Sequence, residues 1–141
     1  ELEREPEGET AAAQAFVAER LNADFAGTGL QRVAFLDDPA WTGTPGHDVV
    51  LVAGGHEFPL DVVGGGVEQA CGYAAYQLQD DAMDELNRPW PELVSPTGEP
   101  VGVLTAPAEV HGVAVWELSG TPFCAVGHLH RAVEAAGLRI R

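Results

Sequence analysis

The longest helical pattern of the chain runs from Val67 to Leu86, and the other elements are best understood in relation to it. Apolar residues recur there at intervals of three and four positions, which places them on one stripe of a helix: Val67, Cys71, Ala74, Ala75, Leu78, Ala82 and Leu86. Polar residues fill the opposite side: Glu68, Gln69, Gln77, Gln79, Asp80, Asp81, Asp84 and Glu85. Glycines at 64–66 and Pro89 punctuate the pattern. We therefore predict a long central helix over 67–87 that packs its apolar stripe on a sheet.

The N-terminal part predicts a tail followed by a shorter amphipathic helix. Residues 1–9 are rich in glutamate and poor in apolar side chains, so burial cannot offset the entropy lost on ordering them. From Thr10, a good N-cap residue, to Phe25 the apolar residues return at helical spacing, and Gly27 follows. Its inward side chains are predicted to be Ala13, Phe16, Val17, Leu21 and Phe25.

Short β-prone segments separate and follow the helices. Residues 32–37 predict a strand, and 49–53 and 56–63 predict a hairpin joined by Gly54-Gly55, with Pro59 favouring an edge strand or a bulge. After Pro89-Trp90-Pro91, in which Trp90 should act as a packing anchor, a second hairpin is expected around residues 95–98. Residues 110–118 then predict a strand, 119–122 a turn, 123–126 its partner strand, 128–136 a short helix and 138–141 a tail.

This order of elements predicts an α+β fold. We expect a flexible acidic tail over 1–9 and a single domain over 10–141. The domain should hold a mostly antiparallel sheet of about five or six strands packed on the central helix, with an N-terminal and a short C-terminal helix.

Charge is the extreme property of this sequence. It has 22 acidic and 7 basic residues among 141, all seven basic residues are arginine, and the formal net charge is −15. Such a field repels nucleic-acid phosphates and anionic lipids, so we expect no nucleic acid and no membrane partner, whereas a basic protein would be attracted. The alternative is that the charge serves only solubility or adaptation to salt. The given sequence has no apolar run of membrane-spanning length, and its first residues are rich in glutamate where a signal peptide would have a basic end and an apolar core, so we expect a cytoplasmic protein. A removed leader before Glu1 is the alternative.

The cysteines and histidines were considered as a metal or catalytic site. Cys124, His128 and His130 lie within seven residues, but a fourth ligand from Cys71, His111 or His56 has no second motif to hold it. Cys71 lies on the apolar stripe, and no nucleophile motif surrounds Cys124. We expect two unbonded thiols rather than a disulfide, no metal and no cofactor, with Cys124 packed in the core and the two histidines capping a short surface helix.

Four carboxylates crowd the last turns of the central helix. Asp80 with Asp84 and Asp81 with Glu85 stand four residues apart, and each like-charged pair costs about 0.2–0.5 kcal/mol. They also lie near the negative end of the helix dipole. The arrangement is consistent with a solvated face, a cation site, or a patch that receives arginines from a partner or from this chain's Arg131, Arg139 and Arg141.

Two segments carry a resemblance to a known group of proteins. YQLQDDAMDELNRPWP over 76–91 and GVAVWELSGTPFCAVGHL over 112–129 resemble a loose group of small, uncharacterised actinobacterial proteins, with similarity over about residues 74–129. Members of that group carry a glutamine-bearing helix, Trp-Pro, and an Ala-Val-Trp strand followed by a turn. They often have cysteine and histidine after Trp-Pro, whereas residues 91–94 here have neither. The resemblance implies a bacterial origin and no particular activity.

The favoured hypothesis is a non-enzymatic acidic interaction or accessory protein that binds a basic protein surface in a bacterial complex, as an immunity-like protein or a subunit. Its binding residues would be Asp80, Asp81, Asp84 and Glu85, because complementary charge raises association rates and selects partners. The alternative is a small metal-dependent or cysteine-dependent enzyme that uses Cys124, His128 and His130. A phosphate-binding loop is excluded, since the glycines match no such motif and the chain has no lysine.

Overall fold

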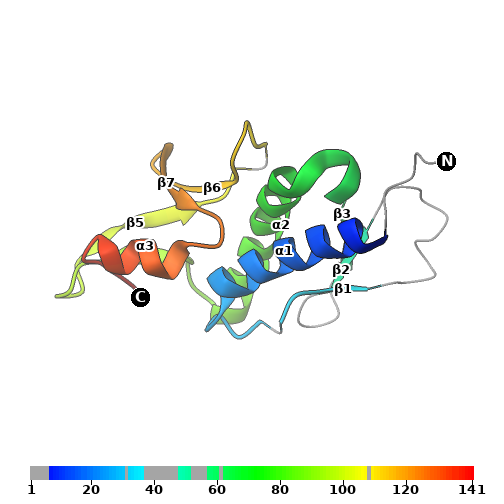
Figure 1. Ribbon diagram of the computed structural model, residues 1–141. Helices are drawn as coiled ribbons and strands as arrows, with labels where there is room; N and C mark the ends of the chain where they lie inside the picture. Colours follow the sequence, from blue (N-terminus) through cyan, green and yellow to red (C-terminus); the bar gives the residue numbers. More distant parts are fainter. Residues whose placement is uncertain (1–6, 31, 37–47, 52–56, 61, 108) are drawn as a thin grey trace.

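The computed structural model describes residues 7–30, 32–36, 48–51, 57–60, 62–107 and 109–141. Within these ranges the chain forms three helices and eight strands, which confirms the predicted α+β class. The strands make two antiparallel sheets where one was predicted. Helices α1 and α2 pack side by side between the sheets, and α3 lies with the larger sheet (Figure 1).

Helix α1, Glu7–Phe25, begins three residues before the predicted N-cap at Thr10. Residues 7–9, which were predicted to belong to the flexible tail, are therefore helical. Val17, Leu21 and Phe25 are buried as predicted, but Phe16 is half exposed. The rest of the predicted acidic tail, residues 1–6, lies outside the described residues.

Helix α2, Val62–Leu86, contains a kink at Gly66, where φ is 86° and ψ is 163°. That conformation strongly favours glycine, and it marks the start of the regular helix close to the predicted position. Residues 62–65, part of which was predicted to extend a strand, form a helical turn before the kink. The predicted apolar stripe is confirmed at its centre, where five side chains are fully buried: Cys71, Ala74, Ala75, Leu78 and Ala82. Helix α2 packs along α1 more than on either sheet.

The smaller sheet has strand order β1-β2-β3. Its strands are β1 (Ala34–Leu36), β2 (Asp48–Leu51) and β3 (Glu57–Leu60). The predicted antiparallel pairing of the first hairpin is confirmed, and Pro59 pairs with Val49 on the edge strand β3, where a missing N–H donor is tolerated. The predicted Gly54-Gly55 turn and residues 37–47 lie outside the described residues.

The larger sheet has strand order β7-β6-β5-β4-β8, with every pair antiparallel. Its strands are β4 (Glu92–Val94), β5 (Pro100–Thr105), β6 (Val115–Leu118), β7 (Thr121–Ala125) and β8 (Arg139–Ile140). The predicted strand over 110–118 is shortened to β6, and Gly112 before it has a φ of 104°. The predicted tail instead forms β8, which pairs with β4. Helix α3, Leu129–Ala135, is confirmed.

Three aromatic side chains join the helices to the larger sheet. Phe25 lies 5.0 Å from Trp90 and 5.9 Å from Trp116 between ring centroids, and the two tryptophans are 5.9 Å apart. Trp90 is only 3% exposed, so the predicted anchor is confirmed. No helix in the described part of the chain combines the length and apolar character needed to cross a membrane.

Candidate functional site

The exposed side of α2 carries two tyrosines and two aspartates in one line. Tyr73, Tyr76, Asp80 and Asp84 are spaced by three, four and four residues, which places them on one stripe of the helix, opposite the buried stripe. All four are exposed, and Tyr73 and Tyr76 are 39% and 44% exposed. We call these four residues the α2 exposed face. It presents aromatic rings toward the N-terminal end and carboxylates toward the C-terminal end.

The other two predicted binding residues lie on the flank of this face. Asp81 is half-buried, and Glu85 is exposed with its side chain beside Gly29. The side chains of Asp80, Asp84 and Glu85 make no ion pair or hydrogen bond with any other described residue, and the last turn of α2 contains no basic residue. Their mutual repulsion and the unfavourable helix dipole are therefore not compensated by a nearby cation within the described structure.

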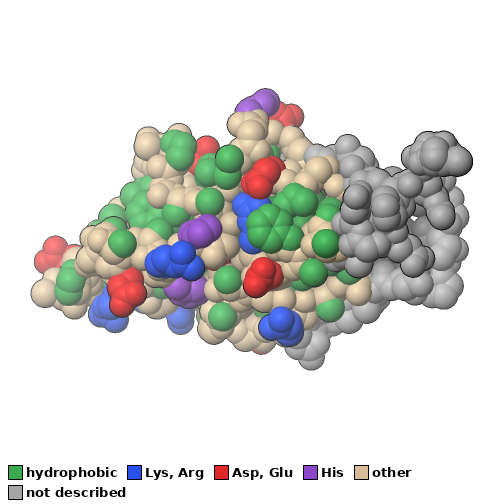
Figure 2. Space-filling view, in the orientation of Figure 1, with side chains coloured by type: hydrophobic (Ala, Val, Ile, Leu, Met, Phe, Trp, Pro, Cys, Tyr) green, Lys and Arg blue, Asp and Glu red, His purple; other side chains and the backbone are tan. Residues whose placement is uncertain are grey.

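The chain's own C-terminal arginines lie elsewhere. Arginine and histidine side chains gather over α3 and the C-terminal end of the chain (Figure 2). Arg141 pairs with Glu92 through Nε and Oε1, 3.0 Å apart, and does not pair with Asp80 or Asp84. Neither Arg139 nor Arg141 is therefore an intramolecular partner of the exposed carboxylates, which was one of the possibilities that the sequence left open.

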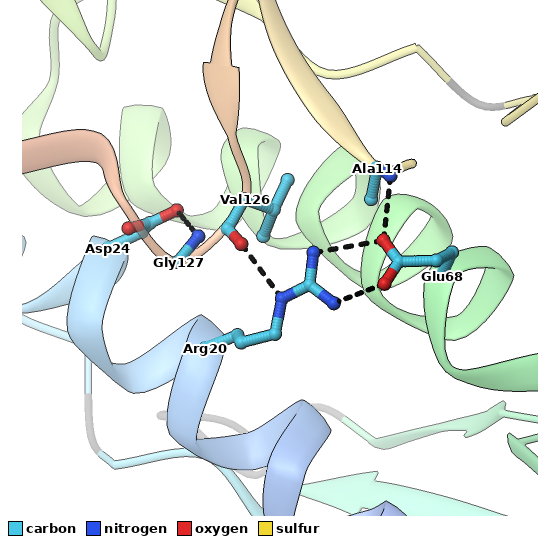
Figure 3. Close-up of polar contacts among 6 residues, drawn as sticks. All are labelled: Arg20, Asp24, Glu68, Ala114, Val126 and Gly127. Atoms are coloured by element: carbon cyan, nitrogen blue, oxygen red, sulfur yellow. Dashed lines mark hydrogen bonds and ion pairs between the residues drawn. The ribbon is translucent and has the colours of Figure 1, made fainter. Parts of the chain in front are cut away.

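A polar network inside the molecule positions α2, and so its exposed face. Arg20 on α1 donates from both Nη atoms to the carboxylate of Glu68 on α2, at 2.7 and 3.0 Å (Figure 3). Arg20 also donates from Nε to the carbonyl oxygen of Val126, and Glu68 accepts from the backbone N–H of Ala114. The hydrogen bonds with Arg20 lower the pKa of Glu68. This network fixes both helices against the ends of the β6–β7 hairpin.

Asp24 is a second internal anchor. Its carboxylate is fully buried and accepts hydrogen bonds from the indole Nε1–H of Trp116 and the backbone N–H groups of Gly127 and Leu129, at 2.8, 2.6 and 3.0 Å. Burial raises the pKa of Asp24, against the opposing effect of these three donors. Leu129 is the first residue of α3, so Asp24 supplies a cap for that helix.

Among the described residues, the enzyme alternative's Cys124, His128 and His130 do not form a candidate metal-binding group. Cys124 is half-buried on β7, His128 and His130 are exposed, and no group of three or more His, Cys, Asp or Glu among the described residues is placed to hold a metal ion. The expected histidine caps are corrected: the side chain of His128 makes no capping bond, and Nε2 of His130 lies 3.1 Å from the backbone oxygen of Asp24. The carboxylate of Asp24 caps the helix instead, by accepting from the backbone N–H of Leu129 at its start.

Both cysteines are free thiols, and their surroundings suppress the thiolate form. Burial raises the pKa of Cys71 to about 11 and that of Cys124 to about 12. A cysteine nucleophile needs the opposite shift, from a nearby cation or a helix N-terminus. The thiol environment therefore does not favour cysteine catalysis.

The sequence interpretation missed the two internal anchors and misplaced one glutamine. Asp24 lies three residues after Leu21 and seven after Val17, so its position on the apolar stripe of α1 was a signal that its carboxylate is buried. Gln79 was assigned to the polar side of α2, yet it is only 7% exposed and bonds to the backbone at Trp90, Leu104 and Ala106. Asp24 and Gln79 use their donors and acceptors on other groups inside the fold, so both have a structural role.

The α2 exposed face is therefore taken as the candidate functional site within the described structure. Comparison with other proteins adds no functional assignment to this geometry. No family model, curated protein or solved structure matches the chain.

Proposed function

We propose that this is a non-enzymatic interaction protein that binds a basic protein surface through the α2 exposed face and its flanking carboxylates Asp81 and Glu85. The observation that carries the proposal is the alignment of Tyr73, Tyr76, Asp80 and Asp84 on one exposed stripe of a helix whose opposite side is fully packed. The face is held rigidly, because Arg20 and Glu68 tie α2 to α1 and to the β6–β7 hairpin. A rigid face loses little conformational entropy on binding.

The chemistry of the face fits arginine side chains on the partner. A guanidinium can bind a carboxylate through two parallel hydrogen bonds and can also stack on an aromatic ring. The four exposed residues offer both kinds of contact within about three turns of helix. Tyrosine is enriched among the residues that dominate binding energy at protein interfaces. The net charge of −15 would accelerate encounter with a basic partner.

The biological setting is a further part of the proposal. An immunity-like or accessory subunit role in a bacterial complex would use such a face, and the bacterial origin rests on the sequence resemblance over residues 74–129. A cytoplasmic location is also proposed. It is supported by the two free thiols Cys71 and Cys124, which a reducing compartment would preserve.

A charge-matched pair of variants tests the proposal. The first carries Asp80→Asn, Asp81→Asn, Asp84→Asn and Glu85→Gln. The second carries Glu19→Gln, Glu99→Gln, Glu109→Gln and Glu134→Gln, four exposed carboxylates outside α2. Both change the formal net charge from −15 to −11. Each tagged protein is used to capture partners from the native cell at about 50 mM and about 500 mM salt, since screening weakens exposed charge contacts.

The expected result is one or more basic proteins bound by the wild type and the control variant, lost with the α2 variant and weakened at high salt. Tyr76→Ala should then weaken binding of the purified partner by roughly fivefold or more, because a tyrosine at the centre of an interface is commonly worth over 1 kcal/mol. Equal capture by both charge variants would contradict the proposal, since only the general field would then matter. Failure of the wild type to retain any basic protein would also contradict it.

A further inference from the structure

A pocket of about 360 Å³ lies at the C-terminal end of α2, between that end, α3 and β8. Its size is at the lower end of the range of small-molecule sites. The described residues that line it are Ala26, Gly27, Leu86, Arg88, Trp90, His130, Val133, Arg139, Ile140 and Arg141.

The charge of the pocket is opposite to that of the whole chain. Three of the seven arginines line it, with one histidine, and no aspartate or glutamate is among the described lining residues. In a chain with 22 acidic residues, this grouping makes a local positive site within a negative field. Such a site should bind anions that are small enough to reach the arginines inside the pocket. Larger anions would remain outside, where the acidic surface of the chain repels them.

The arginines keep donors available for a ligand. Arg88 donates from Nη2 to the backbone oxygen of Arg141 at 2.9 Å, and Arg141 pairs through Nε with Glu92 at 3.0 Å. The side chain of Arg139 makes no hydrogen bond or ion pair with any described residue, whereas its backbone pairs with Val94 between β8 and β4. Each guanidinium has five N–H donors, so the observed bonds leave several unused at all three positions.

The floor of the pocket is apolar. Trp90 and Val133 are buried, and Leu86 and Ile140 are half-buried beside them. A bare inorganic ion would leave this apolar surface unused, whereas an anion with a small hydrophobic body would cover it.

We propose that the pocket binds a small organic anion, with its phosphate or carboxylate held by Arg88, Arg139 and Arg141 and its apolar body against Trp90 and Val133. Both head groups accept the forked hydrogen bonds of arginine, so the shared chemistry is an oxyanion on an apolar group. The inference does not depend on the α2 exposed face, because the pocket shares no residue with it.

Calorimetric titration with three probes at constant ionic strength tests the proposal. The probes are phenyl phosphate, benzoate and inorganic phosphate. We expect saturable binding of phenyl phosphate or benzoate, roughly tenfold tighter than inorganic phosphate because the ring adds buried apolar area. Tighter binding of phenyl phosphate would assign a phosphate ligand, and tighter binding of benzoate a carboxylate ligand. Failure of both aromatic probes to saturate the protein would overturn the proposal.

A matched pair of arginine variants locates the binding. Arg139→Gln should weaken the better probe by at least tenfold without loss of fold, since the side chain of Arg139 has no hydrogen bond or ion pair with the described residues and the backbone pairing with Val94 is kept. Arg131→Gln is the control, because Arg131 is exposed on α3, carries the same charge and does not line the pocket. It should retain binding within about twofold. Equal losses in the two variants would overturn the site, because only the net charge would then matter. Shifts of the Nε–H signals of Arg88 and Arg139 on titration provide a second, residue-level reading.

Discussion

Arg20 and Glu68 face each other across the α1–α2 contact and share two hydrogen bonds, with Nη1 2.7 Å from Oε2 and Nη2 3.0 Å from Oε1. The side chain of Arg20 is 11% exposed and that of Glu68 is 35% exposed, so the pair is partly screened from water. Each partner also binds the β6–β7 hairpin, through Val126 and Ala114. The pair therefore joins three elements that are distant in the sequence, and its loss should affect the packing of the whole domain.

Glu68→Gln should lower the free energy of unfolding by about 1–2 kcal/mol. The amide keeps the shape of the side chain and can still accept from Ala114, but it leaves the buried guanidinium of Arg20 without its counter-charge. Urea denaturation at neutral pH measures the change. Glu19→Gln, which neutralises an exposed glutamate next to Arg20 in the sequence, is the control and should change stability by less than about 0.5 kcal/mol. Equal stabilities of the two variants would show that the ion pair contributes nothing.

The stability contributed by Glu68 should be lost at acidic pH. Arg20 lowers the pKa of Glu68 in the folded state below the ordinary value of 4.5. Between these two pKa values the unfolded chain binds more protons than the folded one, so stability rises with pH there and is lost as pH falls through the folded pKa. The stability gap between wild type and Glu68→Gln should therefore be constant above about pH 5.5 and narrow below 4.5. A gap that widens on acidification would contradict the assignment.

Asp24 should titrate in the opposite direction. Its folded pKa is raised above the ordinary value of 3.8, so the folded state holds the proton at a pH where the unfolded chain has lost it. Asp24 therefore stabilises the folded state most below pH 3.8, and this contribution to stability is lost as the pH rises through the pKa of the folded state. The indole N–H of Trp116 donates to Asp24, so its NMR signal should report the titration with a midpoint above 3.8. A midpoint below that value would show that the three hydrogen bonds outweigh burial.

Gln79→Leu should destabilise the protein by about 2–4 kcal/mol. Gln79 donates to the carbonyl oxygens of Trp90 and Leu104 at 3.0 and 2.7 Å, and leucine would leave both buried oxygens unpaired. Thermal unfolding of this variant is compared with Gln77→Leu, a change of the same type at a half-buried position of the same helix. A loss no larger than that of Gln77→Leu would mean that water replaces the missing donor.

Gln79 also shows which features of the fold can be predicted from the spacing of apolar residues along the chain. Spacing placed the apolar stripe of α2, the antiparallel hairpins and α3 correctly, because these features follow from local patterns of apolar residues and turns. It failed for Gln79, since the backbone groups that this side chain satisfies lie 11 and 25 residues further along the chain. Likewise, β8 depends on pairing with β4 and carries little pattern of its own over two residues.

Only the part of the candidate site that follows from local helical spacing could be predicted from the sequence. The crowding of Asp80 and Asp84 is a local property of the helix, and the sequence indicated it. Tyr73 and Tyr76 align with these carboxylates by the same helical spacing, whereas the face predicted from the sequence comprised carboxylates only. The arginine pocket required the tertiary fold, since Arg88 and Arg139 are brought together by the return of the chain as β8.

Gly72→Ala should destabilise the protein, and a second substitution should restore it. A Cβ at position 72 would overlap Cγ2 of Val110, so the added methyl would force the chain around Val110 to move. We expect a loss of about 1–3 kcal/mol, measured by urea denaturation. Val110→Ala removes the clashing methyl groups, so the double variant should recover stability relative to the sum of the two single changes. Strict additivity would contradict the predicted contact.

Both thiols should react slowly in the folded protein. With pKa values of about 11 for Cys71 and about 12 for Cys124, against an ordinary 9.0, the thiolate fraction near neutral pH falls roughly 100-fold and 1,000-fold. Alkylation with iodoacetamide at about pH 8 should therefore be slow, and it should become fast for both cysteines in concentrated urea, where burial is lost. Mass spectrometry of the modified peptides separates the two sites. Rapid modification of Cys124 in the folded state would contradict this prediction. An activated thiol at that position would favour the alternative hypothesis of a cysteine-dependent enzyme.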